Sequence, residues 1–201
     1  FRYSNTNTGG YPCPPGMIST SDWVYHLDRW NTYVQALLAD ATPGHDTTAK
    51  TSLPTTALST NIKPSSANGR AVMLDTPPAM YENGAVGSGG PYDGIVTLNA
   101  GVPFHFARPA SAGNYDAQRF VEHEIDEVLG LASRLNLVGS DLRPLDLFSC
   151  SSAGIRTLTS SGTRHFSNNP VSTSFVHSIH DSPPASGDVV STAWPPPRHP
   201  R

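Results

Sequence analysis

The chain concentrates its charge in one short stretch, RFVEHEIDEVLGLAS, at residues 119–133. One histidine and four carboxylates occupy the six positions from Glu122 to Glu127, although only 14% of the whole chain is charged. His123 and Glu127 stand four residues apart, so on a helix they project from the same face. An imidazole nitrogen and a carboxylate oxygen at this spacing can bind one ion, which predicts a metal site.

The residue that follows the first ligand suggests what such a site would do. In hydrolytic zinc sites of this design, that residue is a Glu that takes a proton from the metal-bound water. The usual pattern is His-Glu-x-x-His, and here Glu127 stands in place of the second His. A carboxylate makes the site harder and less selective, so Ca²⁺ is an alternative to Zn²⁺. We expect Glu124 to be the general base, with His123 and Glu127 as metal ligands.

The apolar residues of this stretch repeat with a helical period. They predict a helix from about 115 to 131, with Glu124 near the edge of a buried face formed by Ala117, Val121, Ile125, Val128 and Ala132. The β-branched run just upstream predicts a strand from Asp93 to Ala100, an edge against which an extended peptide could pair. His105 follows this strand and could contact substrate, although a half-buried strand histidine is the simpler interpretation.

The rest of the chain predicts one domain with irregular ends. Residues 1–20 are rich in turn formers and read as an irregular lead-in. An amphipathic pattern with a Ser/Thr/Asp start predicts a helix over residues 21–41, which would support the domain of residues 21–167. Residues 168–201 lose this pattern and end in prolines, so we expect an extended or disordered tail.

Composition excludes some classes of function. The 201 residues carry a net charge of -3 and show neither a basic run nor an apolar stretch long enough to span a membrane. Nucleic acid is therefore not an expected partner, and no transmembrane segment is expected. Low Lys and Glu content with abundant Thr, Ser, Asn, Gly and Pro favours a secreted or extracytoplasmic protein, although the chain shows no signal peptide. Cys13 and Cys150 could form a disulfide or remain free.

The motif also resembles known zinc peptidases. Gly130 stands where the metzincin clan turns its chain toward a third ligand, and the clan's third-ligand position falls on Ser133. The clan's methionine-bearing turn is missing, because all three methionines precede the helix. The His-Glu-Ile-x-Glu-Val-x-Gly sequence is similar to that of a narrower family: bacterial metalloprotease-like proteins often exported with a PEP-CTERM sorting segment. Further blocks resemble this family over roughly residues 36–167, including DGIVTLNAGVPF and PLDLFSCSSAGIRTLTSSGTRHFS. The resemblance implies a zinc-dependent hydrolase of peptide bonds.

The third ligand is not determined by the motif. Asp146, which lies in a family-like block, is the preferred candidate, and Asp141 is a second carboxylate shortly after Gly130. Capping of a turn is the alternative role for both. His177 and His180, three residues apart in the tail, could also donate nitrogen.

These observations predict an α/β (α+β) fold: a small twisted sheet, an amphipathic backing helix and a metal-site helix, resembling a reduced metzincin. The expected function is zinc-dependent hydrolysis of a peptide or another small carbonyl substrate such as an ester or lactone. One alternative is a degenerate, non-catalytic metal-binding or binding module. Another is a metal-independent hydrolase that uses Glu124 and Asp146 as a carboxylate pair. The oligomeric state stays open.

Overall fold

The computed structural model describes residues 1–42, 46–133, 135, 141–152, 154–159 and 165–166. Its helices are α1 (Trp30–Asp40), α2 (Thr47–Ser52), α3 (Ser66–Ala71), α4 (Ala117–Val128) and the 3-10 helix η1 (Pro144–Phe148). Its strands are β1 (Arg2–Ser4), β2 (Ser19–Trp23), β3 (Asp28–Arg29), β4 (Asn61–Ile62), β5 (Gly94–Asn99), β6 (Phe104–His105), β7 (Tyr115–Asp116), β8 (Ser149–Ser152), β9 (Ile155–Arg156) and β10 (His165–Phe166). This mixture of helices and small sheets confirms the α+β fold class.

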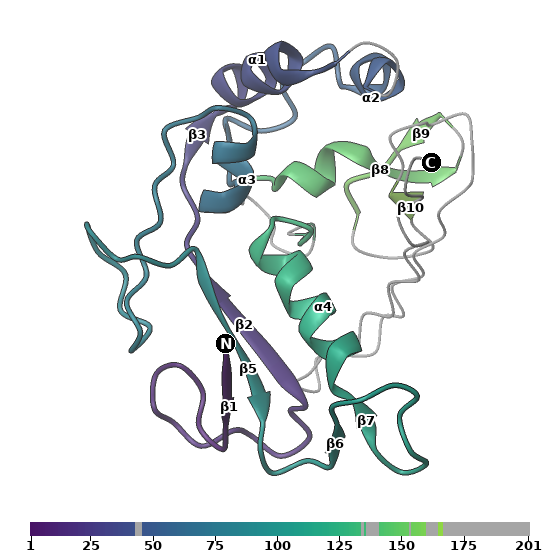
Figure 1. The fold of residues 1–201 in the computed structure, drawn as a ribbon. Coiled ribbons are helices and arrows are strands. Elements are labelled where there is room, and N and C mark those ends of the chain that lie inside the picture. The colour runs from purple at the N-terminus through teal and green to yellow at the C-terminus, as the bar shows by residue number, and fades with distance from the viewer. Residues whose placement is uncertain (43–45, 134, 136–140, 153, 160–164, 167–201) are drawn as a thin grey trace.

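The sheet beside α4 has the strand order β1-β5-β2 (Figure 1). β1 pairs with β5 in parallel, and β2 pairs with β5 antiparallel from Ser19↔Leu98 to Trp23↔Gly94. The strand expected at Asp93 to Ala100 is confirmed as β5. Its expected position at the edge is wrong, because strands pair with it on both sides. β2 is one of the two edge strands of this sheet.

The first forty residues differ from their predicted structure in two ways. The supposed irregular lead-in of residues 1–20 contains β1 and the beginning of β2. The helix predicted over residues 21–41 begins only at Trp30. The Ser/Thr/Asp signal in residues 19–23, STSDW, predicts the start of a helix, but these residues alternate between the two faces of the sheet and pair with β5. Tertiary pairing has therefore overridden a local helix-start signal.

Helix α4 packs directly on the face of the sheet that carries Ser19, Ser21 and Trp23. Residues opposite one another in an antiparallel pair project to the same face, so Trp23 and Gly94 share it. A Cβ added at Gly94 would lie 2.9 Å from Cγ2 of Val128 and 2.6 Å from the carbonyl oxygen of Asp22. A side chain at this position would push the helix away, so the glycine allows the close approach seen in Figure 1.

The described residues form two apolar clusters. The larger joins α1, β4 and the region of η1, and its buried members are Trp30, Tyr33, Ile62, Val72, Leu142 and Leu147. The smaller contains Val24, Met80 and Ile95. Burying one large apolar side chain contributes about 1.5–3 kcal/mol. The larger cluster therefore anchors α1, whose Trp30 and Tyr33 are both buried.

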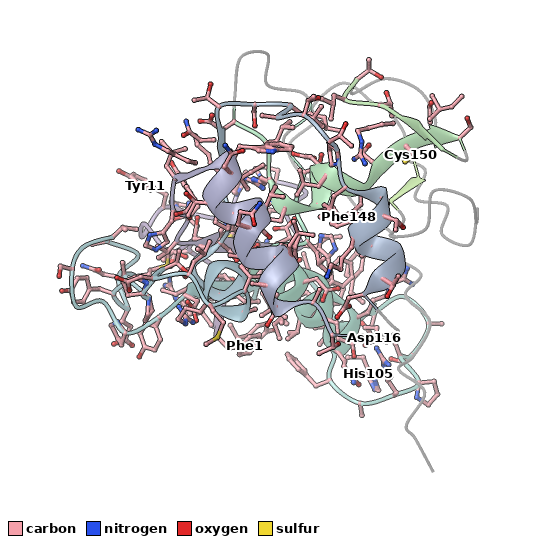
Figure 2. The ribbon with its side chains drawn as sticks, turned by 90° about the horizontal axis from the view of Figure 1, so that it is seen from above. Phe1, Tyr11, His105, Asp116, Phe148 and Cys150 are labelled. Carbon is pink, nitrogen blue, oxygen red and sulfur yellow. The ribbon has the colours of Figure 1, made fainter. Side chains whose placement is uncertain are left out.

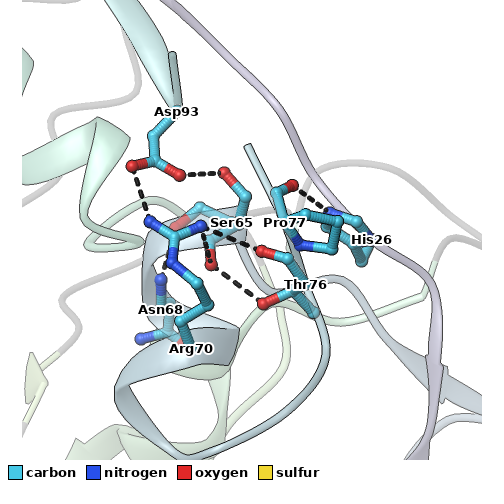
Figure 3. Close-up of polar contacts among 8 residues, drawn as sticks. His26, Ser65, Asn68, Arg70, Thr76, Pro77 and Asp93 are labelled. Atoms are coloured by element: carbon cyan, nitrogen blue, oxygen red, sulfur yellow. Dashed lines mark hydrogen bonds and ion pairs between the residues drawn. The ribbon is translucent and has the colours of Figure 1, made fainter. Parts of the chain in front are cut away.

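A polar network fixes the point at which the chain enters β5 (Figure 3). Arg70 Nη2 donates to Asp93 Oδ2 at 2.7 Å, and Ser66 Oγ donates to Asp93 Oδ1 at 2.6 Å. Arg70 Nη1 also donates to the carbonyl oxygen of Thr76 at 2.9 Å, and the Thr76 hydroxyl donates to the carbonyl of Ser66. The hydrogen bond from Arg70 lowers the pKa of Asp93, against the opposing effect of burial. Helix α3 is thereby tied to the residue that precedes β5.

Both cysteines are free thiols. Cys13 is half-buried, and Cys150 is buried in β8, where Figure 2 labels it. The question left open by the sequence is thus answered against a disulfide.

Within the described ranges, no helix combines the length and the apolar character that crossing a membrane requires. The Pro-rich segment of residues 168–201 lies outside the described residues.

Candidate metal centre on helix α4

Helix α4 forms where the sequence predicts it, but it presents a different face to the protein. Asp116 caps its beginning by accepting a hydrogen bond from the backbone N–H of Arg119 at 3.2 Å. The buried helical residues include Ala117 and Glu124, whereas Ile125 remains 43% exposed. The buried face of the helix therefore does not run through Ile125 as predicted, and it includes Glu124 instead. The reason is that the sheet presents Ser19 and Ser21 to the helix. These hydroxyls donate hydrogen bonds to carboxylates and do not form an apolar surface.

His123 and Glu127 lie together as their spacing predicts. His123 Nε2 is 3.7 Å from Glu127 Oε1, and the two side chains are 18% and 28% exposed. Two ligand atoms that each lie about 2.1 Å from one zinc ion can be at most about 4.2 Å apart. The pair thus fits two positions of one coordination sphere.

Strand β2 supplies hydrogen-bond partners for the carboxylates of Glu124 and Glu127. Ser19 Oγ donates to Glu124 Oε1 at 2.5 Å, and Ser21 Oγ donates to Glu127 Oε2 at 2.5 Å. Glu124 is only 5% exposed, so the prediction that it lies toward the buried edge is confirmed. Sequence reasoning missed both serines, because residues 19–22 are all polar and show no apolar alternation that would indicate a strand.

The charges at this position leave Glu127 in an unfavourable environment when no cation is bound. Burial raises the pKa of Glu127, and the negative charge of Glu124 raises this pKa further. The hydrogen bond from Ser21 and the positive charges of His123 and Arg143 act in the opposite direction without cancelling the increase. A bound cation would relieve this cost, because it favours the ionised carboxylate.

Arg143 is a second group that sequence reasoning missed. Its guanidinium carbon lies 5.0 Å from the centroid of the Trp23 ring, at the end of β2 nearest the helix C-terminus. Nothing in the local sequence RPLD indicates that this arginine returns to β2. The approach results from tertiary packing alone.

Asp146, the preferred third ligand, occupies a capping position instead. It is fully buried, and its two carboxylate oxygens accept hydrogen bonds from Ser133 Oγ at 2.7 Å and from the backbone N–H of Arg143 at 2.8 Å. Ser133, the third-ligand position of the metzincin pattern, therefore contacts Asp146. Asp141 accepts a hydrogen bond from Asn61 Nδ2 at 3.2 Å.

In the part of the chain that the structure describes, no three His, Cys, Asp or Glu side chains converge as metal ligands. Asp146 is thus not brought together with His123 and Glu127, and its role as a ligand stays a prediction. His177 and His180 lie outside the described residues.

His105 lies toward the other end of the helix. β6 pairs with β7, which places His105 opposite Asp116, and Figure 2 labels the two residues close together. The ring Nδ1 donates to the carbonyl oxygen of Ala107 at 2.5 Å. Asp116 precedes His123 by seven residues, or about 10 Å along a helix axis. A contact between His105 and substrate stays a prediction, and it requires a substrate that extends along α4.

Comparisons of this chain with protein-family models, with curated proteins and with solved structures find no match. The described residues provide two donors that fit one metal ion, a buried carboxylate next to them and a nearby arginine.

Proposed function

We propose that this chain is a zinc-dependent hydrolase of the metallopeptidase type. The observation that carries the proposal is the His123–Glu127 pair, 3.7 Å apart on the helix face that also presents the buried carboxylate of Glu124. Two ligands four residues apart, with a Glu directly after the first, are the arrangement in which helical zinc sites perform hydrolysis.

Each residue has a distinct role in this proposal. His123 and Glu127 hold the ion, which when bound supplies an activated water and polarises a carbonyl. Glu124 would accept a proton at its carboxylate, which the hydrogen bond from Ser19 orients. Asp146 is the proposed third ligand, and it would have to exchange its contact with Ser133 for the metal. Zn²⁺ is the preferred ion, with Ca²⁺ as the alternative that a carboxylate-rich site would admit.

The proposed substrate is a peptide, with esters and lactones as further carbonyl substrates. An extended peptide could pair with β2, because β2 is an edge strand and its Ser19 and Ser21 contact the two glutamates. We further propose that the protein acts outside the cytoplasm, on the basis of its low Lys and Glu content and its many small polar residues.

A non-catalytic metal-binding or binding module is the second candidate function. The observation that favours it is that only two donors come together among the residues the structure describes. Such a module would have no use for a proton acceptor, so the role of Glu124 separates the two functions.

The experiment is a comparison of the zinc-supplemented parent protein with Glu124→Gln. Peptide, ester and lactone substrates should be hydrolysed by the parent, and Glu124→Gln should keep its zinc while kcat falls by roughly 10² to 10⁴. Asp22→Asn, an exposed carboxylate of β2, is the matched control and should retain parental kcat. Equal hydrolysis by Glu124→Gln and the parent would exclude this mechanism and favour the binding module.

A further inference from the structure

Arg143 is held over the indole of Trp23, beside the proposed centre. Trp23 and Ser21 lie two positions apart in β2, so their side chains share the face that meets α4. Ser21 contacts Glu127, and the Arg143 guanidinium lies 5.0 Å from the Trp23 ring. The guanidinium is therefore placed on the same side of the sheet as the His123–Glu127 pair.

The backbone that carries Arg143 is fixed by buried groups. Its N–H donates to Asp146 Oδ2, Asp146 is fully buried, and Pro144 follows as the first residue of η1. Ser133 holds the other oxygen of Asp146. The arginine thus projects from a rigid turn, and the aromatic ring limits the positions that its guanidinium can take.

A permanent positive charge next to a pair that holds a cation lowers the affinity for that cation, since like charges repel. Such a charge is useful where an anionic group must bind near the ion. A planar guanidinium has five N–H donors, whose geometry matches the two oxygens of a carboxylate. Lysine, as a compact point charge, reproduces the charge but not this two-point geometry.

We propose that Arg143 binds a carboxylate of the substrate and makes the site selective for peptides that end in a free carboxylate next to the cleaved bond. This inference rests on the proposed hydrolase function for the position of the cleaved bond. The carboxylate contact itself does not depend on that function, because it uses the guanidinium of Arg143 held over Trp23, and neither residue is a proposed metal ligand.

The test begins with binding to the metal-free protein. N-acetylalanine and N-acetylalanine amide serve as probes, and chemical-shift titration gives the Kd of each. The parent should bind the acid at least about tenfold more tightly than the amide, as a charge-assisted pair predicts. Arg143→Gln should abolish this preference, and Arg143→Lys should retain only part of it. Arg119→Gln, which removes an exposed arginine of α4, should bind like the parent.

A hydrolysis assay separates this inference from the proposed function. N-acyl dipeptides with a free C-terminus should show a KM at least about tenfold lower than their amides in the parent, and equal KM values in Arg143→Gln. Hydrolysis of both without preference, together with equal binding of acid and amide, would overturn the role of Arg143 alone. A preference for the acid in binding without any hydrolysis would support the carboxylate contact and contradict the hydrolase function.

Discussion

Ser21 Oγ donates a 2.5 Å hydrogen bond to Glu127 Oε2, while the other oxygen of that carboxylate faces His123 at 3.7 Å. One oxygen is thus fixed by strand β2, and the second is directed toward the proposed metal partner. A strand more than ninety residues earlier in the chain therefore orients Glu127, the second proposed ligand on the helix. Partners of this kind orient metal ligands in many metalloproteins.

Ser21→Ala should weaken zinc binding more than it destabilises the fold. Loss of a partner that orients a ligand typically costs about 10- to 100-fold in metal affinity. Competition with a chromogenic chelator measures this change. Thr20→Ala, whose side chain lies on the opposite face of the strand, is the control and should leave zinc affinity unchanged. Equal affinities for Ser21→Ala and the parent would show that Glu127 does not depend on β2.

Gly130 sets the angle at which the chain leaves α4. Its φ is 100°, and a Cβ there would lie 2.9 Å from Cβ of Asn68, whose side chain accepts a hydrogen bond from the Tyr33 hydroxyl. Gly130→Ala should therefore lower the free energy of unfolding by about 1–3 kcal/mol.

Gly113 offers the matched control for this substitution. Its φ is 83°, and a Cβ there would have no neighbour within 4 Å. Gly113→Ala should cost only the backbone strain, about 1 kcal/mol. Urea denaturation measures both variants. If Gly130→Ala lost no more stability than Gly113→Ala, the close contact with Asn68 would not contribute.

The sequence was informative where one local pattern decided the structure. The helical period predicts a helix from about 115 to 131, where α4 lies at Ala117–Val128, and the β-branched run predicts β5, because both signals are local and strong. The burial of Ile125 was predicted wrongly. Its neighbours Glu124 and Glu127 turn toward the sheet because Ser19 and Ser21 donate to them, and no window of the sequence around α4 contains that information.

The site was only partly predictable for the same reason. His123, Glu124 and Glu127 lie within five residues, so their spacing placed them on one helix. Arg143 approaches Trp23 across the fold. A partnership between residues 120 positions apart leaves no trace in a single sequence.

The ion pair between Arg70 and Asp93 should make the free energy of unfolding depend on pH in the acidic range. The pKa of Asp93 is lowered in the folded protein, chiefly by the hydrogen bond from Arg70. The resulting stabilisation is present above the pKa of the unfolded chain, about 3.9, and is lost as the pH falls through the lower folded value.

Asp93→Asn should therefore destabilise the protein at pH 7 and show a smaller difference from the parent near pH 2. The effect should be about 1 kcal/mol or less, because the Arg70 side chain is 39% exposed and solvent screens the pair. Urea unfolding at both pH values measures it, with Asp22→Asn as the exposed control. A difference between Asp93→Asn and the parent that stayed constant with pH would mean that the ion pair does not stabilise the fold.

The most direct test of the metal centre is the zinc content of the purified protein after supplementation and removal of excess metal, measured by elemental analysis. The parent should retain about one equivalent of zinc, and so should Glu124→Gln, because only the ligands are needed to hold the ion. His123→Ala and Glu127→Gln should lose most of it, since each removes one of the two paired donors. A parent without zinc, or a His123→Ala variant that retains as much zinc as the parent, would contradict the assignment of His123 and Glu127 as a metal site.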